Sequence, residues 1–194
     1  MSSINLENLT MPESTSYVYL FRNCYELESV KLPKNATIIH SLIFDGCYNL
    51  KNVDIPDTVT TIGFCAFQDC GIESITLPSS LTTIGEEAFG KCTNLESITI
   101  PDSVTIIDEG AFKGCTKLKN ITLSSSLTTI SKEAFCNCTE LESIIIPDSV
   151  ISIDEAAFKG CTKLKNITLP SSLTTISKEA FCNCTELESI IIPD

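Results

Sequence analysis

The chain repeats one pattern of hydrophobic and polar positions about every 23 residues. In a representative copy, Leu95 is followed three residues later by Ile98 and two further on by Ile100, and Pro101 comes next. Alternating apolar and polar residues are typical of a strand with one buried face. Proline has no backbone donor and ends such a strand. The pattern therefore predicts one short strand per repeat, and stacking the repeats would align these strands in a parallel sheet.

The rest of each repeat predicts turns and a second extended segment. Asp102-Ser103 is turn chemistry, because short polar side chains accept backbone N–H bonds. Residues 81–84 are rich in Thr and Ile and predict a second short strand. Residues 86–89 and 132–135 each end in Ala-Phe and predict a single helical turn, too short to be an independent helix.

The position before each periodic cysteine predicts a sharp end to that helical turn. Gly114 and Asn137 occupy it in two copies, and both residue types tolerate a positive φ. Lys91 departs from this preference, and we expect Gly90 beside it to take the positive φ.

Eight periodic cysteines divide the chain into repeats. Each interval is 23 residues, except that Cys70 and Cys92 are 22 apart. We predict a single solenoid domain over residues 1–194, with a degenerate N-terminal repeat (1–23), seven repeats of 22–23 residues (24–183) and the start of a truncated eighth (184–194). The eighth repeat has no polar cap, so we expect a truncated chain or an end that packs against another chain, including end-to-end self-association.

A period of two repeats overlies the first. Residues 92–137 and 138–183 match at 40 of 46 positions. Three columns of charged residues alternate in sign from one repeat to the next. We hypothesise that the longer period exists because a slip by one repeat would place like charges together. The columns are Glu96, Lys119, Glu142, Lys165 and Glu188; Lys117, Glu140, Lys163 and Glu186; and Glu109, Lys132, Glu155 and Lys178.

The predicted core consists of thin layers. Hydrophobic residues make up 43% of the chain, but only 7% are aromatic and there is no Trp. One phenylalanine recurs per repeat, and we expect these rings to stack as one buried column. They are Phe44, Phe67, Phe89, Phe112, Phe135, Phe158 and Phe181.

Charge and hydropathy exclude several classes of partner. The net charge of −12 argues against binding to nucleic acid and to anionic lipid surfaces, which favour Lys and Arg. No apolar run approaches the ~18–20 residues that span a bilayer, so no membrane insertion is expected in this segment. Residues 1–5 show no export signal.

The eleven cysteines have two interpretations. As a disulfide framework they would indicate a secreted protein with a free thiol. As a column of small apolar residues they would be reduced packing thiols. Stacked rungs would hold them ~4.8 Å apart, so distance does not exclude bridges. However, the Cα–Cβ bonds of stacked cysteines should run parallel to one another, and this orientation favours reduced thiols over disulfide bridges. No CxxC pair is present and His40 is the only His, so no metal site is predicted.

The sequence contains no motif that indicates a catalytic site. There is no Gly-rich phosphate loop, and His40 lies in a variable turn where a solvated side chain is expected. Acid pairs such as Glu86-Glu87 recur because the repeat recurs, which indicates a charged outer face. We therefore predict that the protein is not an enzyme and needs no cofactor.

The repeated motif resembles the BspA-like leucine-rich repeat family. Its pattern here runs from Leu95 through Pro101, Val104 and Phe112 to Cys115, and it recurs over roughly residues 24–194. The resemblance implies an α/β repeat solenoid, a right-handed horseshoe with a parallel sheet on one face, mostly β with short helical turns. It also implies a cell-surface or secreted protein that adheres to host matrix proteins. The alternative is an intracellular structural scaffold, which the thiols and the lack of a visible export signal favour.

The outward row at the centre of each predicted strand is the candidate protein-binding site. From Thr76 onward this row and the row two residues earlier carry no charge, which favours a dry, shape-complementary contact with a protein partner. Thr and Ile are also simply good strand formers. Regular threonine rows could suit a repeating ligand such as a glycan or ice. The candidate residues are Thr76, Thr99, Thr122, Ile145, Thr168 and Ile191.

Overall fold

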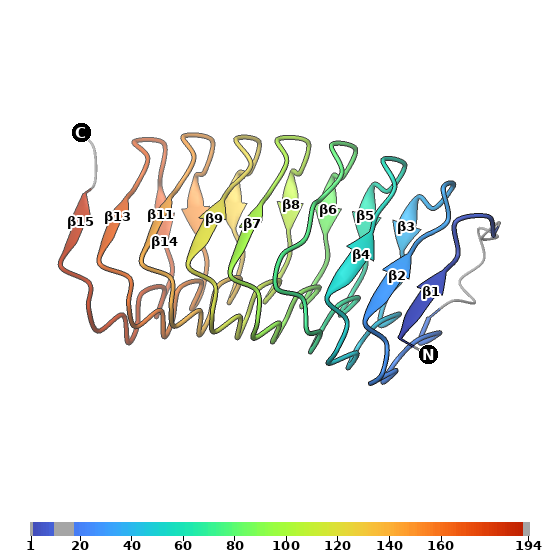
Figure 1. Cartoon of the computed structure of the whole chain (residues 1–194). Helices are drawn as coiled ribbons and strands as arrows, with labels where there is room; N and C mark the ends of the chain where they lie inside the picture. Colours follow the sequence, from blue (N-terminus) through green and yellow to red (C-terminus); the bar gives the residue numbers. More distant parts are fainter. Residues whose placement is uncertain (1, 10–17, 192–194) are drawn as a thin grey trace.

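The chain winds into a stack of similar rungs, seen in a computed structural model that describes residues 2–9 and 18–191. Strands of two or three residues from successive rungs lie side by side along an elongated, gently bent rod (Figure 1). No helix occurs in these residues, so the predicted α/β class and its helical turns are wrong. The protein is a parallel β-solenoid.

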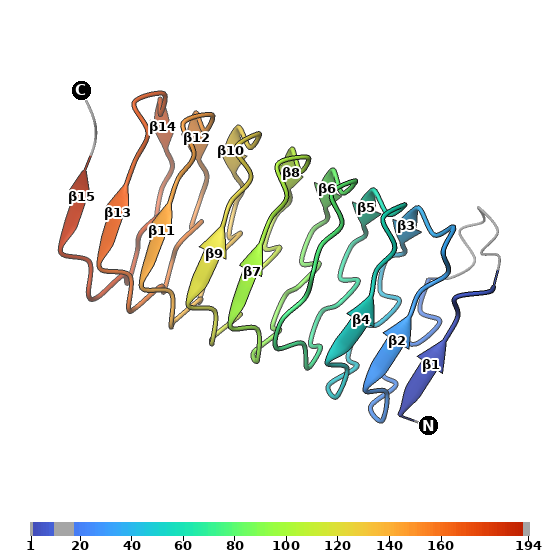
Figure 2. The ribbon, with the colours of Figure 1, turned by 45° about the horizontal axis from the view of Figure 1, so that its top comes forward.

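Two rows of strands run along the rod, one at the front and one at the back (Figure 2). The predicted strand of each repeat forms the front row, and the predicted second strand forms the back row. All pairings are parallel, and equivalent residues face each other, as Ile98 faces Ile121. The front strands are β1 (Ser3–Asn5), β2 (Ser29–Lys31), β4 (Asn52–Asp54), β7 (Ser97–Thr99), β9 (Asn120–Thr122), β11 (Ser143–Ile145), β13 (Asn166–Thr168) and β15 (Ser189–Ile191). The back strands are β3 (Ile38–Ile39), β5 (Thr61–Ile62), β6 (Thr83–Ile84), β8 (Ile106–Ile107), β10 (Thr129–Ile130), β12 (Ser152–Ile153) and β14 (Thr175–Ile176).

Tight turns replace the predicted helical turn on the third side of each rung. Glu87 and Glu133, in the middle of the two predicted helical turns, have φ of 49° and 54°. A right-handed helix cannot contain such residues. A second positive φ precedes each periodic cysteine, as predicted for Gly114 and Asn137. Lys91 itself takes this conformation, with φ of 54°, so the expectation that Gly90 would replace it is wrong.

The turns are joined from rung to rung by a ladder of backbone hydrogen bonds, here called the turn column. The N–H of Gly110 donates to Lys132 O (2.9 Å), and that of Phe112 donates to Ala134 O (2.9 Å). Gly114 N–H donates to Cys136 O in the same way (2.8 Å). The intervening N–H groups bond within their own turn. Alternate residues of each turn therefore donate to the following rung, and the third side is hydrogen-bonded without being a strand.

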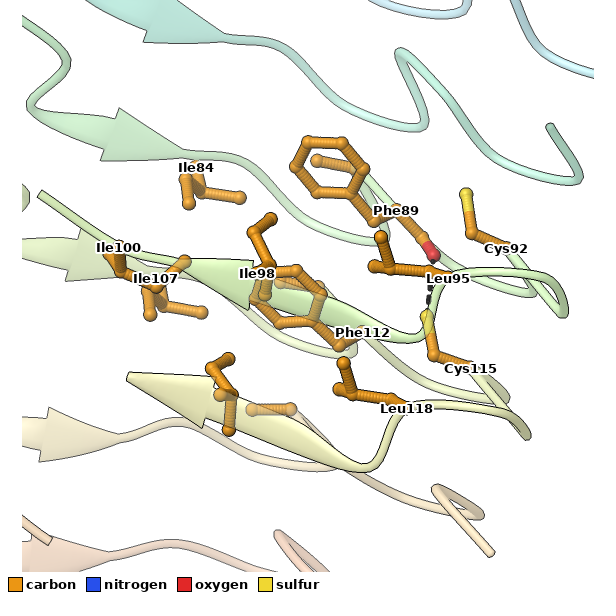
Figure 3. Close-up of a cluster of buried hydrophobic side chains, with 14 of the residues drawn as sticks. Ile84, Phe89, Cys92, Leu95, Ile98, Ile100, Ile107, Phe112, Cys115 and Leu118 are labelled. Atoms are coloured by element: carbon orange, nitrogen blue, oxygen red, sulfur yellow. Dashed lines mark hydrogen bonds between the residues drawn. The ribbon is translucent and has the colours of Figure 1, made fainter. Parts of the chain in front are cut away.

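Stacked phenylalanines fill the core, as predicted. Successive rings lie parallel, with centroids 5.4 Å apart between Phe89 and Phe112 and 5.6 Å apart between Phe112 and Phe135. The rings from Phe44 to Phe158 are fully buried, whereas Phe181 is half-buried. Figure 3 shows aliphatic side chains from the front and back strands packing around two of these rings.

The periodic cysteines form a second buried column beside the rings. All eleven cysteines in the chain are free. The Cys115 thiol donates to Phe89 O of the preceding rung at 3.1 Å (Figure 3), and Cys138 donates to Phe112 O at 3.2 Å. These cysteines therefore pack as small apolar residues and also hydrogen-bond one rung to the next.

The charged columns form pairs rather than continuous ladders. Glu109 binds Lys132 at 2.7 Å, and the same pair recurs 46 residues later between Glu155 and Lys178 at 3.0 Å. In the second column, Lys163 binds Glu140 at 2.8 Å. The column of Glu96, Lys119, Glu142, Lys165 and Glu188 contains no ion pair between its own described members. The two-repeat period is therefore visible in ion pairs at some positions only.

Candidate binding surface

The predicted outward row lies on the front of the rod. Thr99 in β7, Thr122 in β9 and Thr168 in β13 are exposed, and the Ile145 side chain in β11 is 79% exposed. Ile191 lies in β15 and pairs with Thr168, but its side chain is outside the described part of the structure. Thr76 is exposed but does not belong to a strand. The structure thus places four of the six residues in one row along the sheet.

Charged residues occupy only the N-terminal end of this face. Lys31 in β2 lies 3.4 Å from Asp54 in β4 and 3.2 Å from Glu7. From Thr76 to Thr168, both outward positions of each rung are Ser, Thr, Asn or Ile. Most ion pairs among the described residues of the later rungs come from the turns and corners instead, such as Lys132 with Glu109. The later part of the face is therefore uncharged.

The front sheet is interrupted at residues 74–76. One bridge joins Ser74 to Ser97, whereas β4 pairs with β2 and with no later strand in the described chain. A hollow of about 660 Å³ lies between β4 and residues 74–79, and another of about 480 Å³ lies between those residues and β7. A second break in the ladder separates β9 from β11, which still lie next to each other.

A short corner accounts for the interruption at residues 74–76. The missing residue of the 22-residue repeat falls between Cys70 and Ile72, where Gly71 takes the place of Thr93-Asn94 in the next copy. The corner is so tight that a Cβ on Gly71 would lie 2.2 Å from Tyr48 O. The back strands of the same rung stay in register, since Thr61 faces Thr83. Within this rung, therefore, only the front segment at residues 74–76 is displaced from the ladder of its neighbours.

Replacing Gly71 with Val should destabilise the protein by about 3 kcal/mol, because the new Cβ meets a backbone oxygen and the chain itself must move. Urea unfolding followed by circular dichroism would measure this loss. The matched control is Gly90→Val, where the new Cβ would lie 3.2 Å from its nearest neighbour, Glu87 O. Equal stability of the Gly71 variant and the wild type would contradict the short-corner explanation.

The polar residues considered for catalysis are scattered. His40, expected to be solvated, is half-buried directly after β3. Glu87 accepts a hydrogen bond from Gln68 Nε2 at 2.6 Å, so this side chain joins two rungs. No group of three potential metal ligands occurs in residues 2–9 and 18–191. Within the same residues, no helix is long and apolar enough to cross a bilayer.

Comparison with known proteins finds that the chain is similar to leucine-rich repeat proteins of bacteria. A leucine-rich repeat protein from Bacteroides ovatus is 33% identical with a TM-score of 0.89, and the match covers 99% of this chain and 51% of that one. A leucine-rich cell-surface protein from Faecalibacterium prausnitzii is 29% identical with a TM-score of 0.54, over 91% of this chain and 62% of that one. The chain therefore spans about half to two thirds of the length of these relatives.

A third structure shares the fold. The T. pallidum leucine-rich repeat protein is 24% identical with a TM-score of 0.68, over 97% of this chain and 78% of that one. No curated protein matches the sequence. Six copies of the BspA type leucine rich repeat region match residues 15–139 and 82–194. This match extends over nearly the whole chain, and the chain therefore belongs to the BspA type leucine-rich repeat family.

Proposed function

We propose that the chain is a non-catalytic protein-binding module of a cell-surface or secreted protein, and that its partner binds the uncharged front face. The observation that carries the proposal is the row of Thr99, Thr122, Ile145 and Thr168, all exposed along one side of a rigid stack. Ile145 is the largest apolar contribution, at 79% exposed. Aliphatic and hydroxyl groups free of charge suit the dry centre of a protein interface, where charged residues are depleted.

The relatives support the same proposal. The Faecalibacterium prausnitzii protein is described as a leucine-rich cell-surface protein, and a surface protein needs a face for partners. Family resemblance favours adhesion to host matrix proteins. A panel of purified extracellular-matrix proteins, immobilised on a sensor surface, is therefore the first set of partners to test.

Changing Thr99, Thr122 and Ile145 together to Lys should weaken binding to the matrix proteins at least tenfold, because three cations would enter an uncharged contact. Surface plasmon resonance against the panel would measure this. The matched control reverses the charges of Glu96, Lys119 and Glu142, which are exposed and make no ion pair with any described residue. Loss of binding in the control, with full binding by the folded Lys variant, would place the site elsewhere. If no matrix protein binds the wild type, adhesion is not the function.

The free thiols favour a second candidate, an intracellular structural scaffold. All eleven cysteines are free, and cysteines persist as thiols most readily in reducing compartments. Mass spectrometry of the protein from its native source distinguishes the two. Attached glycans or a removed leader would support the surface module, whereas free thiols without either modification would support the scaffold.

A further inference from the structure

We propose that the hollow between β4 and residues 74–79 binds an extended peptide segment that carries a Lys or Arg side chain. The inference rests on the proposed function, because it specifies one part of the front face and the kind of partner segment that it takes. Three independent features support it: open backbone edges, a partly uncovered apolar floor and a carboxylate that no described residue pairs with.

The first feature is a pair of strand edges that face each other without hydrogen bonds. At three other rungs the residue after the front strand donates to the next rung: Leu6 N–H to Lys31 O at 2.9 Å, Leu32 N–H to Asp54 O at 3.1 Å and Ile100 N–H to Thr122 O at 2.9 Å. Ile55 is the equivalent residue of β4, and no such bond joins it to residues 74–77 in the described chain. Backbone groups at an open edge are a template for an added strand.

The rung is nevertheless held at both ends of the opening. Gly71 N–H donates to Cys47 O at 3.4 Å before the opening, and Thr82 N–H donates to Thr60 O at 2.8 Å after it. Lys51 and Glu73 also join the two rungs through an ion pair of 2.9 Å. The two rungs are therefore joined on both sides of the hollow along the chain, and its volume of about 660 Å³ lies in the range of ligand pockets.

The second feature is the floor of the hollow. Val53, Ile55 and Ile75 line it and are only partly buried. Their counterparts in the neighbouring rungs are covered, since Val30 is 3% exposed and Ile98 is 4% exposed. Small aliphatic side chains of a bound segment would complete the packing that the displaced rung leaves open.

The third feature is the charge at the rim. Asp54 and Asp57 line the hollow, and Asp54 is already paired with Lys31. Asp57 makes no hydrogen bond or ion pair within the described residues. Two rungs later the equivalent Asp102 accepts bonds from Ser125 N–H (2.9 Å) and Ser125 Oγ (2.8 Å). Asp57 is thus an exposed carboxylate of the same type that makes no such bonds to its own chain, and a Lys or Arg of the segment is the complementary group.

A positional library of acetylated linear decapeptides tests the proposal, with one position at a time fixed as Lys, Glu or Ala. We expect that, for one or two of the ten peptide positions, the pool with Lys fixed there binds the wild-type protein at least tenfold more tightly than the pool with Glu fixed there. Asp57→Asn should reduce this preference at least fivefold. Asp102→Asn, at the equivalent position with its bonds to Ser125, should leave it unchanged.

A second variant tests the hollow without removing a charge. Replacing Gly71 with Thr-Asn, the residues of positions 93–94, restores the 23-residue repeat and should close the hollow. We expect this variant to fold and to lose binding to every pool. The inference is wrong if no pool binds the wild type, if Lys and Glu pools bind equally, or if the repaired variant binds as well as the wild type. None of these results would contradict the proposed function, which the Lys variant of Thr99, Thr122 and Ile145 tests separately.

Discussion

Raising the pH above about 9 should unfold the protein cooperatively, because its buried thiols must stay protonated in the folded state. Burial raises the pKa of the Cys92 thiol to about 12 and raises the pKa of Cys115 and of Cys138 well above the ordinary value. In the unfolded chain the same thiols titrate near pH 8.5. The unfolded state then binds fewer protons than the folded state, so the free energy of unfolding falls as the pH rises.

The expected loss is large because the thiols act together. Each contributes full stability below its unfolded pKa, and above that value the loss is ~1.4 kcal/mol per pH unit until the folded pKa is reached. Five of the buried thiols would together lose on the order of 7 kcal/mol per pH unit, which exceeds the stability of an ordinary domain within about two units. These are Cys70, Cys92, Cys115, Cys138 and Cys161.

Urea unfolding at a series of pH values from 7 to 10 would measure the dependence, with thiolate absorbance as a second signal. Cys115→Ala is the matched variant. It should lower the stability at neutral pH, yet reduce the pH slope by ~1.4 kcal/mol per unit, because one proton fewer is linked to unfolding. A stability that stays level between pH 8 and 10 would show that the thiols are not buried as the structure has them.

Replacing Phe112 with Ala should destabilise the protein by about 3–5 kcal/mol, as expected for a large truncation in a packed core. The ring is fully buried and stacks on both neighbours, so its removal leaves a cavity between two rings that the neighbouring rungs cannot fill. Thermal and urea unfolding would measure the change.

Phe181→Ala provides the comparison, because this ring is only half-buried and stacks on Phe158 alone in the described chain. We expect its cost to be less than half of that at Phe112. Equal costs at the two positions would mean that burial does not govern the contribution of the column.

The repeat, both rows of strands and the stacked rings were predictable because each depends on a residue type that recurs in register. A proline at the position of Pro101 ends the strand in its repeat, and a phenylalanine at the position of Phe112 has a large apolar ring that must be buried. The turns were predicted wrongly because a sequence such as Glu86 to Phe89 suits one helical turn as well as it suits tight turns. Gly110 was the available signal, since it occupies the position at which Glu87 and Glu133 adopt a positive φ.

The candidate site was only partly predictable. Alternation along the strands was enough to place Thr99, Thr122 and Ile145 on one exposed row. The hollow escaped prediction, although its cause is visible as the single interval of 22 residues. A deletion in a corner indicates that one rung is shorter, but the position of that rung depends on how closely the corner packs, since a Cβ on Gly71 would lie 2.2 Å from Tyr48 O.

The turn column makes the rod electrically polar along its length. Its linking peptide groups all point the same way, with N–H toward the following rung and C=O toward the preceding one. Peptide dipoles of about 3.5 D that are aligned head to tail add up, as they do in an α-helix. Here the positive end faces the C-terminal rungs, opposite to the sense of a helix, whereas the alternating groups of the strands largely cancel. A rod that has no helix among its described residues thus carries a helix-like macrodipole on one side, and each added rung lengthens it.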